Sequence, residues 1–176
     1  MDIDRETAAA LGWPKLKYAG VERERRWLCA AVPTGRVLRR ETITDLYVIA
    51  TQLRLREAVP LGDGTPIRRL TRKGDVDSHT RLLTSIYLSP EEFGLLSALP
   101  GRTLRKTRHR IGLVKGVEMS VDVFEGALAG LILAEAEFDD AVTMAAYPAP
   151  DFAIREVTDD PRYSGGRLAA EGLPDE

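Results

Sequence analysis

The feature that most constrains this chain is a run of charges near its start, VERERRWL at residues 21–28. In a β-strand, side chains at alternating positions share one face, so Glu22, Glu24 and Arg26 would point to the same side. Burying three such charges on an inner face is costly unless they are paired or bind an ion. The run therefore indicates a strand that contributes charge to a polar site.

The same two-residue spacing recurs at three later places in the chain: Arg54 and Arg56, Lys106 and Arg108, and Glu135 and Glu137. Four strands that each place charges on one face predict a sheet closed into a barrel with a charged lumen. Such a lumen would suit a polyanion together with a metal ion.

Length and composition fit one domain with one sizeable core, at 176 residues, 30% charged side chains and a net charge of −2. The overall charge gives no argument for nucleic acid or membrane binding. Lys and Arg predominate between Arg54 and Arg110, whereas Asp and Glu predominate between Glu118 and Asp160. The two regions could simply pair with each other, or they could form an anion site beside a metal site.

Cysteine and histidine usage bounds the chemistry. The single cysteine, Cys29, excludes an internal disulfide and is expected to be a small core residue, and two histidines argue against an ordinary zinc site. The chain has no stretch of 18 apolar residues, so no membrane span is predicted. An acidic start without an apolar signal core leads us to expect a cytoplasmic protein.

Local patterns organise the chain into an arm, 1–18, that could hold a short helix, and a single domain, 19–172. Strands are predicted at 21–32, 51–59, 67–73, 82–88, 103–113, 117–124 and 132–138. A helix should begin at Ser89, with Pro90 at its first position and Glu92 completing a capping box. Further short helices are predicted near 139–147 and 161–168. The pattern indicates an α+β fold whose sheet closes into a barrel.

Two sets of charges could carry the chemistry. The acids are hard oxygen ligands of the kind that Mg²⁺ and Mn²⁺ prefer, although each pair alone could be a solvated strand face: Glu22, Glu24, Glu135, Glu137 and, as a fifth, Asp122. The bases could bind phosphate oxygens, or could lie on outer faces or pair with the acids: Arg54, Arg56, Lys73, Lys106 and Arg108. Few aromatic residues lie among these charges, which argues against nucleic acid.

Tyrosine and histidine side chains offer weaker signals. Tyr47 could orient or deprotonate a water, or could be a half-buried core tyrosine. His109 has the opposite parity to Arg108 and should point out of the lumen, and His79 lies in a polar loop. Arg68 and Arg69 are expected to include solvent-facing charges.

The charged segments together resemble the CYTH superfamily, the triphosphate tunnel metalloenzymes. Residues 22–26 (ERERR) are similar to its Glu-x-Glu-x-Lys signature, with Arg26 in place of the Lys. Arginine keeps the charge but is a far poorer proton acceptor. Segments similar to the later motifs follow in the same order, at 53–57, 70–73, 105–109, 121–126, 130–137 and 155–163.

The resemblance implies an eight-stranded antiparallel β-barrel whose tunnel binds a triphosphate with Mg²⁺ or Mn²⁺. It implies metal-site acids at Glu22, Glu24, Asp122, Glu135 and Glu137. It implies a phosphate path along Arg26, Arg54, Arg56, Lys73, Lys106 and Arg108. By the same resemblance Tyr47 would position the water, with Glu22 and Glu24 also catalytic, and Glu156 could reach the tunnel.

The function expected is metal-dependent hydrolysis of inorganic triphosphate, a small-molecule substrate, by a phosphohydrolase that acts on phosphoanhydride bonds. Two alternatives stay open: a class IV-type adenylate cyclase that makes cyclic AMP and pyrophosphate from ATP, and a non-catalytic polyphosphate- or nucleotide-binding module. No clear adenine-stacking pair is seen, which weighs against the cyclase. Thiamine triphosphate would want an aromatic clamp, for which Trp13 and Trp27 are the only tryptophans. A homodimer is compatible with such barrels, but nothing in the sequence decides it.

Overall fold

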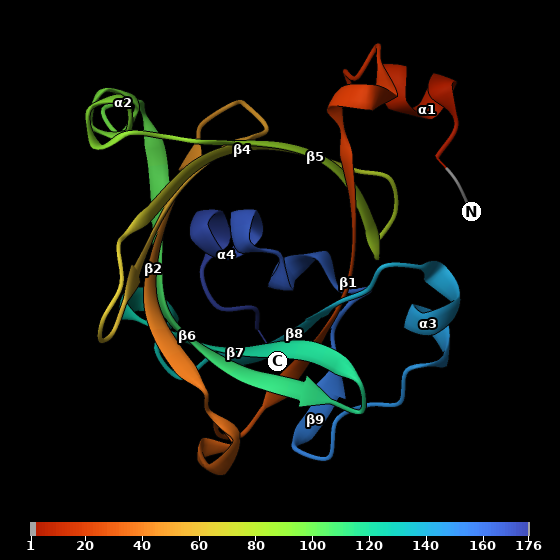
Figure 1. Cartoon of the computed structure of the whole chain (residues 1–176), viewed down its shortest axis with the longest axis vertical. Coiled ribbons are helices and arrows are strands. Elements are labelled where there is room, and N and C mark those ends of the chain that lie inside the picture. Colours follow the sequence, from red (N-terminus) through yellow and green to blue (C-terminus); the bar gives the residue numbers. More distant parts are fainter. Residues whose placement is uncertain (1–2, 176) are drawn as a thin grey trace.

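The fold is an antiparallel β-barrel, seen in a computed structural model that describes residues 3–175. Neighbouring strands pair in the order β5-β4-β3-β2-β6-β7-β8-β1-β9, and β5 pairs again with β1, which closes eight strands into a ring (Figure 1). The strands are β1 (Gly20–Cys29), β2 (Arg39–Val48), β3 (Leu53–Pro60), β4 (Ile67–Asp75), β5 (Thr80–Tyr87), β6 (Gly101–Val114), β7 (Val117–Phe124), β8 (Ile132–Glu137) and β9 (Ala153–Glu156). The predicted eight-stranded antiparallel barrel is confirmed.

Two strands, β2 and β9, lie outside the segments that the sequence predicts as strands. Strand β9 is short and extends the edge of β1 beyond the point where β5 leaves it. Strand β2 is ten residues long and pairs along its length with β3 and β6. Its middle is rich in β-branched residues, but its inner face carries Glu41 and Asp45, so the alternation of apolar and polar residues that marks a strand is weak.

In the described part of the chain, four short α-helices accompany the barrel: α1 (Arg5–Ala10), α2 (Pro90–Leu96), α3 (Ala141–Ala146) and α4 (Gly165–Glu171). The capping box predicted for α2 is confirmed, because the Ser89 hydroxyl accepts from the Glu92 N–H and the Glu92 carboxylate accepts from the Ser89 N–H. Helix α3 lies within the segment predicted near 139–147 and is capped by Asp140. The segment predicted near 161–168 is a 3₁₀ turn followed by α4.

An apolar cluster lies under α3, on the outside of the barrel wall. Trp27, Val121 and Ala134 are fully buried there, and the Trp27 ring lies 6.0 Å from the Tyr147 ring. Cys29 is buried in the same cluster, which confirms its prediction as a small core residue. These residues occupy the outer face of β1, β7 and β8, so the opposite face of the same strands is free for charged side chains.

A second apolar cluster closes one end of the barrel. Leu168 of α4 is buried against a layer that includes Leu104, Phe124 and Leu133. Figure 1 shows α4 within the outline of the strand ring. The Arg102 guanidinium donates to the carbonyl oxygen of Ala170 at 2.6 Å and holds the helix to β6. The lumen therefore has an apolar floor at the α4 end.

The N-terminal arm packs on the barrel. Trp13 is buried with Ala8 and Leu82, and its indole N–H donates to the Thr84 hydroxyl at 2.9 Å. The Arg72 guanidinium lies 4.1 Å from the centre of the Trp13 ring. Within residues 3–175, no helix is both long enough and apolar enough to cross a bilayer.

Replacing Leu168 with Ala tests the anchoring of α4. Because Leu168 is the buried residue of this helix, the loss of its side chain should lower the free energy of unfolding by about 2–5 kcal/mol. The matched control is Arg167→Ala, an exposed neighbour on the same helix, which should change stability by less than about 0.5 kcal/mol. Urea unfolding of the three proteins measures both values, and equal stability of all three would show that α4 is not anchored by this contact.

Candidate functional site

The inner face of the barrel gathers the charges that the sequence singled out. Cross-strand register places Glu24 opposite Glu137, Arg26 opposite Glu135, and Arg108 opposite Asp122. All the predicted acidic and basic site residues project into the lumen: Glu22, Glu24, Arg26, Arg54, Arg56, Lys73, Lys106, Arg108, Asp122, Glu135 and Glu137. The structure brings these residues together, and their roles in binding and catalysis stay predictions.

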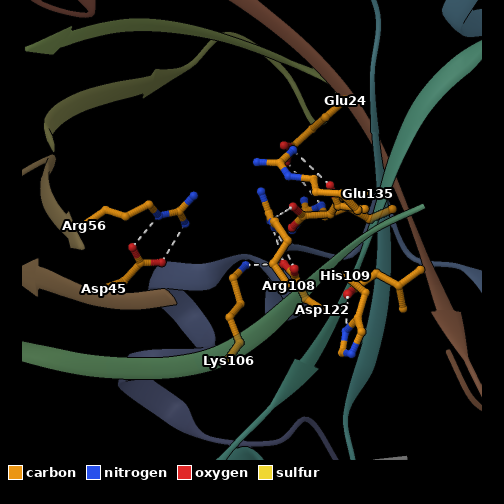
Figure 2. A network of polar contacts seen from close by, with 12 residues as sticks. Glu24, Asp45, Arg56, Lys106, Arg108, His109, Asp122 and Glu135 are labelled. Atoms are coloured by element: carbon orange, nitrogen blue, oxygen red, sulfur yellow. Dashed lines mark hydrogen bonds and ion pairs between the residues drawn. The ribbon is translucent and has the colours of Figure 1, made fainter. Parts of the chain in front are cut away.

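On one wall, Asp45 holds two arginines of β3. The Arg56 guanidinium forms a two-pronged contact with the Asp45 carboxylate, at 2.6 and 2.7 Å (Figure 2). The Arg54 Nε lies 3.8 Å from the same carboxylate. Burial alone would raise the pKa of Asp45, but Arg56 and Arg54 outweigh it and hold the pKa well below its usual range. Asp45 belongs to the strand that sequence reasoning missed, so its role as the buried counter-ion was missed too.

On the facing wall, Asp122 and Glu135 bind the cations of β6. The Arg108 guanidinium donates to both Asp122 oxygens, at 2.7 and 2.6 Å, and to Glu135 at 2.5 Å, and the Lys106 ammonium also contacts Asp122 (Figure 2). These cations overcome the effect of burial and keep the pKa of Asp122 and of Glu135 below their ordinary values. Both carboxylates are therefore ionised in the folded protein at neutral pH.

The acids of β1 are paired with β4 and β5. The Lys73 ammonium lies 2.5 Å from Glu22, and the Arg81 guanidinium contacts Glu24 and lies 2.7 Å from Asp75. Burial would raise the pKa of Glu22, but Lys73 and Arg81 lower it overall. Arg81 was not predicted, because the strand was expected to begin one residue later, at Leu82. A turn at 77–79 followed directly by Thr-Arg could have suggested it.

Arg26 is positioned by the C-terminal segment. Its guanidinium donates to the buried carbonyl oxygen of Tyr163 at 2.7 Å, and its backbone N–H donates to the Thr158 hydroxyl at 3.0 Å. Its Nε lies 3.4 Å from Glu24. The segment before α4 thus fixes the arginine that occupies the place of the signature lysine.

Of the predicted acids of the lumen, Glu137 alone forms no ion pair within residues 3–175. It lies directly opposite Glu24 across the β1–β8 ladder, and like charges in that position repel each other. Burial, followed by Glu22 and Glu135, raises the pKa of Glu137 above its ordinary value. Converging carboxylates with a deficit of positive charge fit a hard divalent cation such as Mg²⁺ or Mn²⁺. The acids are not already arranged as a cage, since no group of three or more metal-ligating side chains is formed in the described part of the chain.

Tyr47 lies at the boundary between the charged lumen and its apolar floor. It packs with the cluster beneath α4, and a Cβ atom on Gly165 would collide with its hydroxyl group. Burial, followed by the negative charge of Asp45, raises the pKa of Tyr47 to about 12. The phenol is therefore protonated at neutral pH and can donate a hydrogen bond, but it is a poor base.

The structure corrects one residue and locates two others. Glu156 does not reach the tunnel, because it binds Arg25 on the outer face of β1 at 2.7 and 2.6 Å. His109 lies on the opposite face of β6 from Arg108, with its Nδ1 atom 3.2 Å from the Val121 carbonyl oxygen (Figure 2). His79 is in the β4–β5 turn, next to Ser78 at 2.9 Å. Neither histidine is in the charged lumen.

A closed antiparallel barrel with opposed carboxylates and guanidinium groups in its lumen defines a charged-tunnel protein. The inorganic triphosphatase of Nitrosomonas europaea is 32% identical over 154 residues, which span 84% of this chain and 96% of that protein. The crystal structure of the inorganic triphosphatase NE1496 superposes with a TM-score of 0.59 at 28% identity, over 88% of this chain and 97% of that chain.

A more distant structure, the PH1819 protein of Pyrococcus horikoshii, shares the fold, with a TM-score of 0.51 at 24% identity over 70% of this chain and 82% of that one. No family model matches the sequence. The chain belongs to the triphosphate tunnel metalloenzymes, the CYTH superfamily.

The Asp45→Asn variant tests the buried counter-ion. Removing one partner of a buried ion pair leaves the Arg56 charge uncompensated and should cost about 3–5 kcal/mol of unfolding free energy at pH 7. Because the pKa of Asp45 is lower folded than unfolded, its contribution is present at neutral pH and is lost as the pH falls below about 4. Urea unfolding at several pH values should therefore show the gap between wild type and variant narrowing in acid. A gap that stays constant would contradict this assignment.

Proposed function

We propose that this protein hydrolyses inorganic triphosphate to pyrophosphate and phosphate in a metal-dependent reaction. The observation that carries the proposal is the lumen itself, where a line of cations on β3, β4 and β6 faces carboxylates on β1 and β8. A linear triphosphate is a compact polyanion that such a line can grip, and guanidinium forks match its oxygens. The similarity to an inorganic triphosphatase supports the same substrate.

Internal ion pairs suggest how substrate and metal enter together. In the structure Lys73 binds Glu22, Arg81 binds Glu24 and Arg108 binds Glu135. Phosphate oxygens can replace these carboxylates as partners of the cations. The carboxylates that are released become available for a cation, so each ligand favours binding of the other.

The metal site that we propose is formed by Glu22, Glu24, Glu135 and Glu137. Asp122 is less available to a metal, because it pairs with both Lys106 and Arg108. When bound, Mg²⁺ or Mn²⁺ would neutralise charge on the phosphate oxygens and help to activate the attacking water. The protein's own cations hold the chain of phosphates in line and stabilise the charge that develops on the leaving pyrophosphate. In the reaction a P–O bond forms to the water oxygen and one P–O–P linkage breaks.

Tyr47 would act as a positioning donor. Its protonated phenol lies beside Arg54 in the β2–β3 ladder and is held in place from below by α4. From there it can orient a water or a phosphate oxygen by donating its proton in a hydrogen bond. Proton abstraction from the water would have to come from a carboxylate or from a substrate oxygen.

Phosphate release from tripolyphosphate tests the function. We expect rapid release with Mg²⁺ or Mn²⁺, none in EDTA, and little turnover of ATP. Glu24→Gln should lower turnover by roughly 10- to 100-fold at a fixed metal concentration, because one charged ligand is lost. The control Glu171→Gln, on the exposed surface of α4, should behave as wild type. Release that persists in EDTA, or full activity of Glu24→Gln, would overturn the proposal, and cyclic AMP formed from ATP would point to a cyclase.

The Tyr47→Phe variant separates a positioning role from a basic one. We expect kcat to fall by roughly 10- to 100-fold with little change in KM, because a positioned donor is lost. The pKa of Tyr47 is about 12, so the ratio of wild-type to variant kcat should stay flat between about pH 7 and 10. A ratio that rises with pH would instead identify the phenolate as the active form.

A further inference from the structure

A cavity of about 560 Å³ opens at the end of the barrel opposite α4. It is lined by the first residues of β2 and β4 and the last part of β6, whereas the α4 end is formed by the last residues of β2 and the first of β6. Ile43 and Arg56 line the cavity on the side of the lumen. Its wall also includes Arg69 of β4, Tyr87 of β5 and Arg110 of β6. The cavity therefore continues the charged lumen outward.

Arg69 is the unusual residue of this cavity. It lies opposite Arg56 in the β3–β4 ladder, and like charges in that position repel each other. Arg56 is neutralised by Asp45, but no carboxylate in residues 3–175 is within ion-pair distance of Arg69, and its buried Nε has no hydrogen-bond partner there. A buried guanidinium donor without an acceptor is costly, so the position is suited to an anion from outside the protein.

Further positive charge leads from Arg69 to the rim. Arg110, on β6, shares its guanidinium between Glu41 at 3.0 Å and Ser120 at 3.1 Å, and it lies opposite Arg39 in the β2–β6 ladder. The acids that line the cavity are Glu41 and Asp63, against five arginines, of which Arg56 and Arg110 have carboxylate partners, Asp45 and Glu41 respectively. Within residues 3–175, Arg39, Arg40 and Arg69 form no ion pair, so the cavity carries an excess of positive charge.

We propose that this cavity is an anion subsite that takes the further phosphates of a linear polyphosphate longer than triphosphate, with Arg69 as the residue that determines chain-length preference. The inference rests on the proposed function, since the first three phosphates occupy the lumen. An organic group on the last phosphate is the competing occupant, because Tyr87 offers an exposed ring at the rim. The contacts of Arg69 favour phosphate, since its unpartnered guanidinium requires acceptor oxygens, which each added phosphate supplies.

The test compares chain lengths in Arg69→Met, which removes the charge and keeps an extended side chain. The control is Arg68→Met, the adjacent arginine on the outer face, where it pairs with Glu57 at 2.8 Å. With metal present, kcat/KM is measured for triphosphate, tetraphosphate and ATP. We expect Arg69→Met to lower the tetraphosphate value roughly tenfold or more and the triphosphate value less than about threefold, and Arg68→Met to change neither.

Three kinetic outcomes would overturn the proposal. Equal losses for both chain lengths would place Arg69 in the triphosphate site itself, and no loss for either would remove it from the substrate path. A loss confined to ATP, reproduced by Tyr87→Ala, would assign the cavity to an organic group.

Binding measurements without turnover test the proposed subsite independently of the proposed hydrolytic function. Calorimetric titration with triphosphate and with tetraphosphate in EDTA measures affinity without turnover. If tetraphosphate binds more tightly than triphosphate and Arg69→Met abolishes the difference, the subsite stands even where no hydrolysis is seen. If triphosphate is hydrolysed but the wild-type protein binds both anions equally, the subsite falls and the hydrolytic function stands. Thermal unfolding of both variants confirms that they are folded.

Discussion

Charge pairing in the lumen is the constraint on which the rest of this structure depends. A closed barrel takes its inner side chains out of bulk water, and isolated charges there would be prohibitive. Most of the inner cations therefore meet a carboxylate from another strand, as Arg56 meets Asp45 and Arg108 meets Asp122, whereas Arg69 meets none within residues 3–175. These pairs join strands that are neighbours in the ring, so barrel closure and charge balance depend on each other. In the proposed function, a substrate and a metal would replace these internal partners.

The apolar residues of the chain are distributed to make that charged lumen possible. One cluster, around Trp27, lies outside the wall beneath α3, and another, around Leu133, forms the floor beneath α4. Most of the hydrophobic stabilisation therefore comes from the outside and from one end of the barrel, rather than from its centre. The apolar clusters and the charged side chains thus occupy different parts of the barrel, with Tyr47 at the boundary between the floor and the charged lumen.

Sequence alone predicted the barrel and the strands whose inner faces carry charges at a spacing of two, and the side chains of Glu22, Arg56 and Glu135 lie where that spacing requires. It could not predict β2 with equal ease, because polar residues on the inner face of that strand hide the alternation on which prediction depends. Because β2 was not predicted, Asp45, the counter-ion of Arg56, was not predicted either.

Contacts between residues of distant strands could not be predicted from local sequence patterns. Arg81 meets Glu24 only because β5 closes the ring against β1, and Glu156 is drawn away from the tunnel by Arg25 on the outer face. The sequence predicted only that Arg68 and Arg69 include solvent-facing charges, and the register against Arg56 places Arg69 on the inner face. Register between distant segments depends on the closed sheet as a whole.

The apolar floor beneath α4 determines how a ligand can enter and leave the barrel. A barrel sealed at one end by Leu168 and its neighbours is a blind chamber rather than a passage. A ligand that enters at the mouth must leave by the same route, past the same arginines. A product must therefore leave before the next substrate can enter. Tight binding of an anion at the mouth would help the chamber to fill, but it would also slow release of the product.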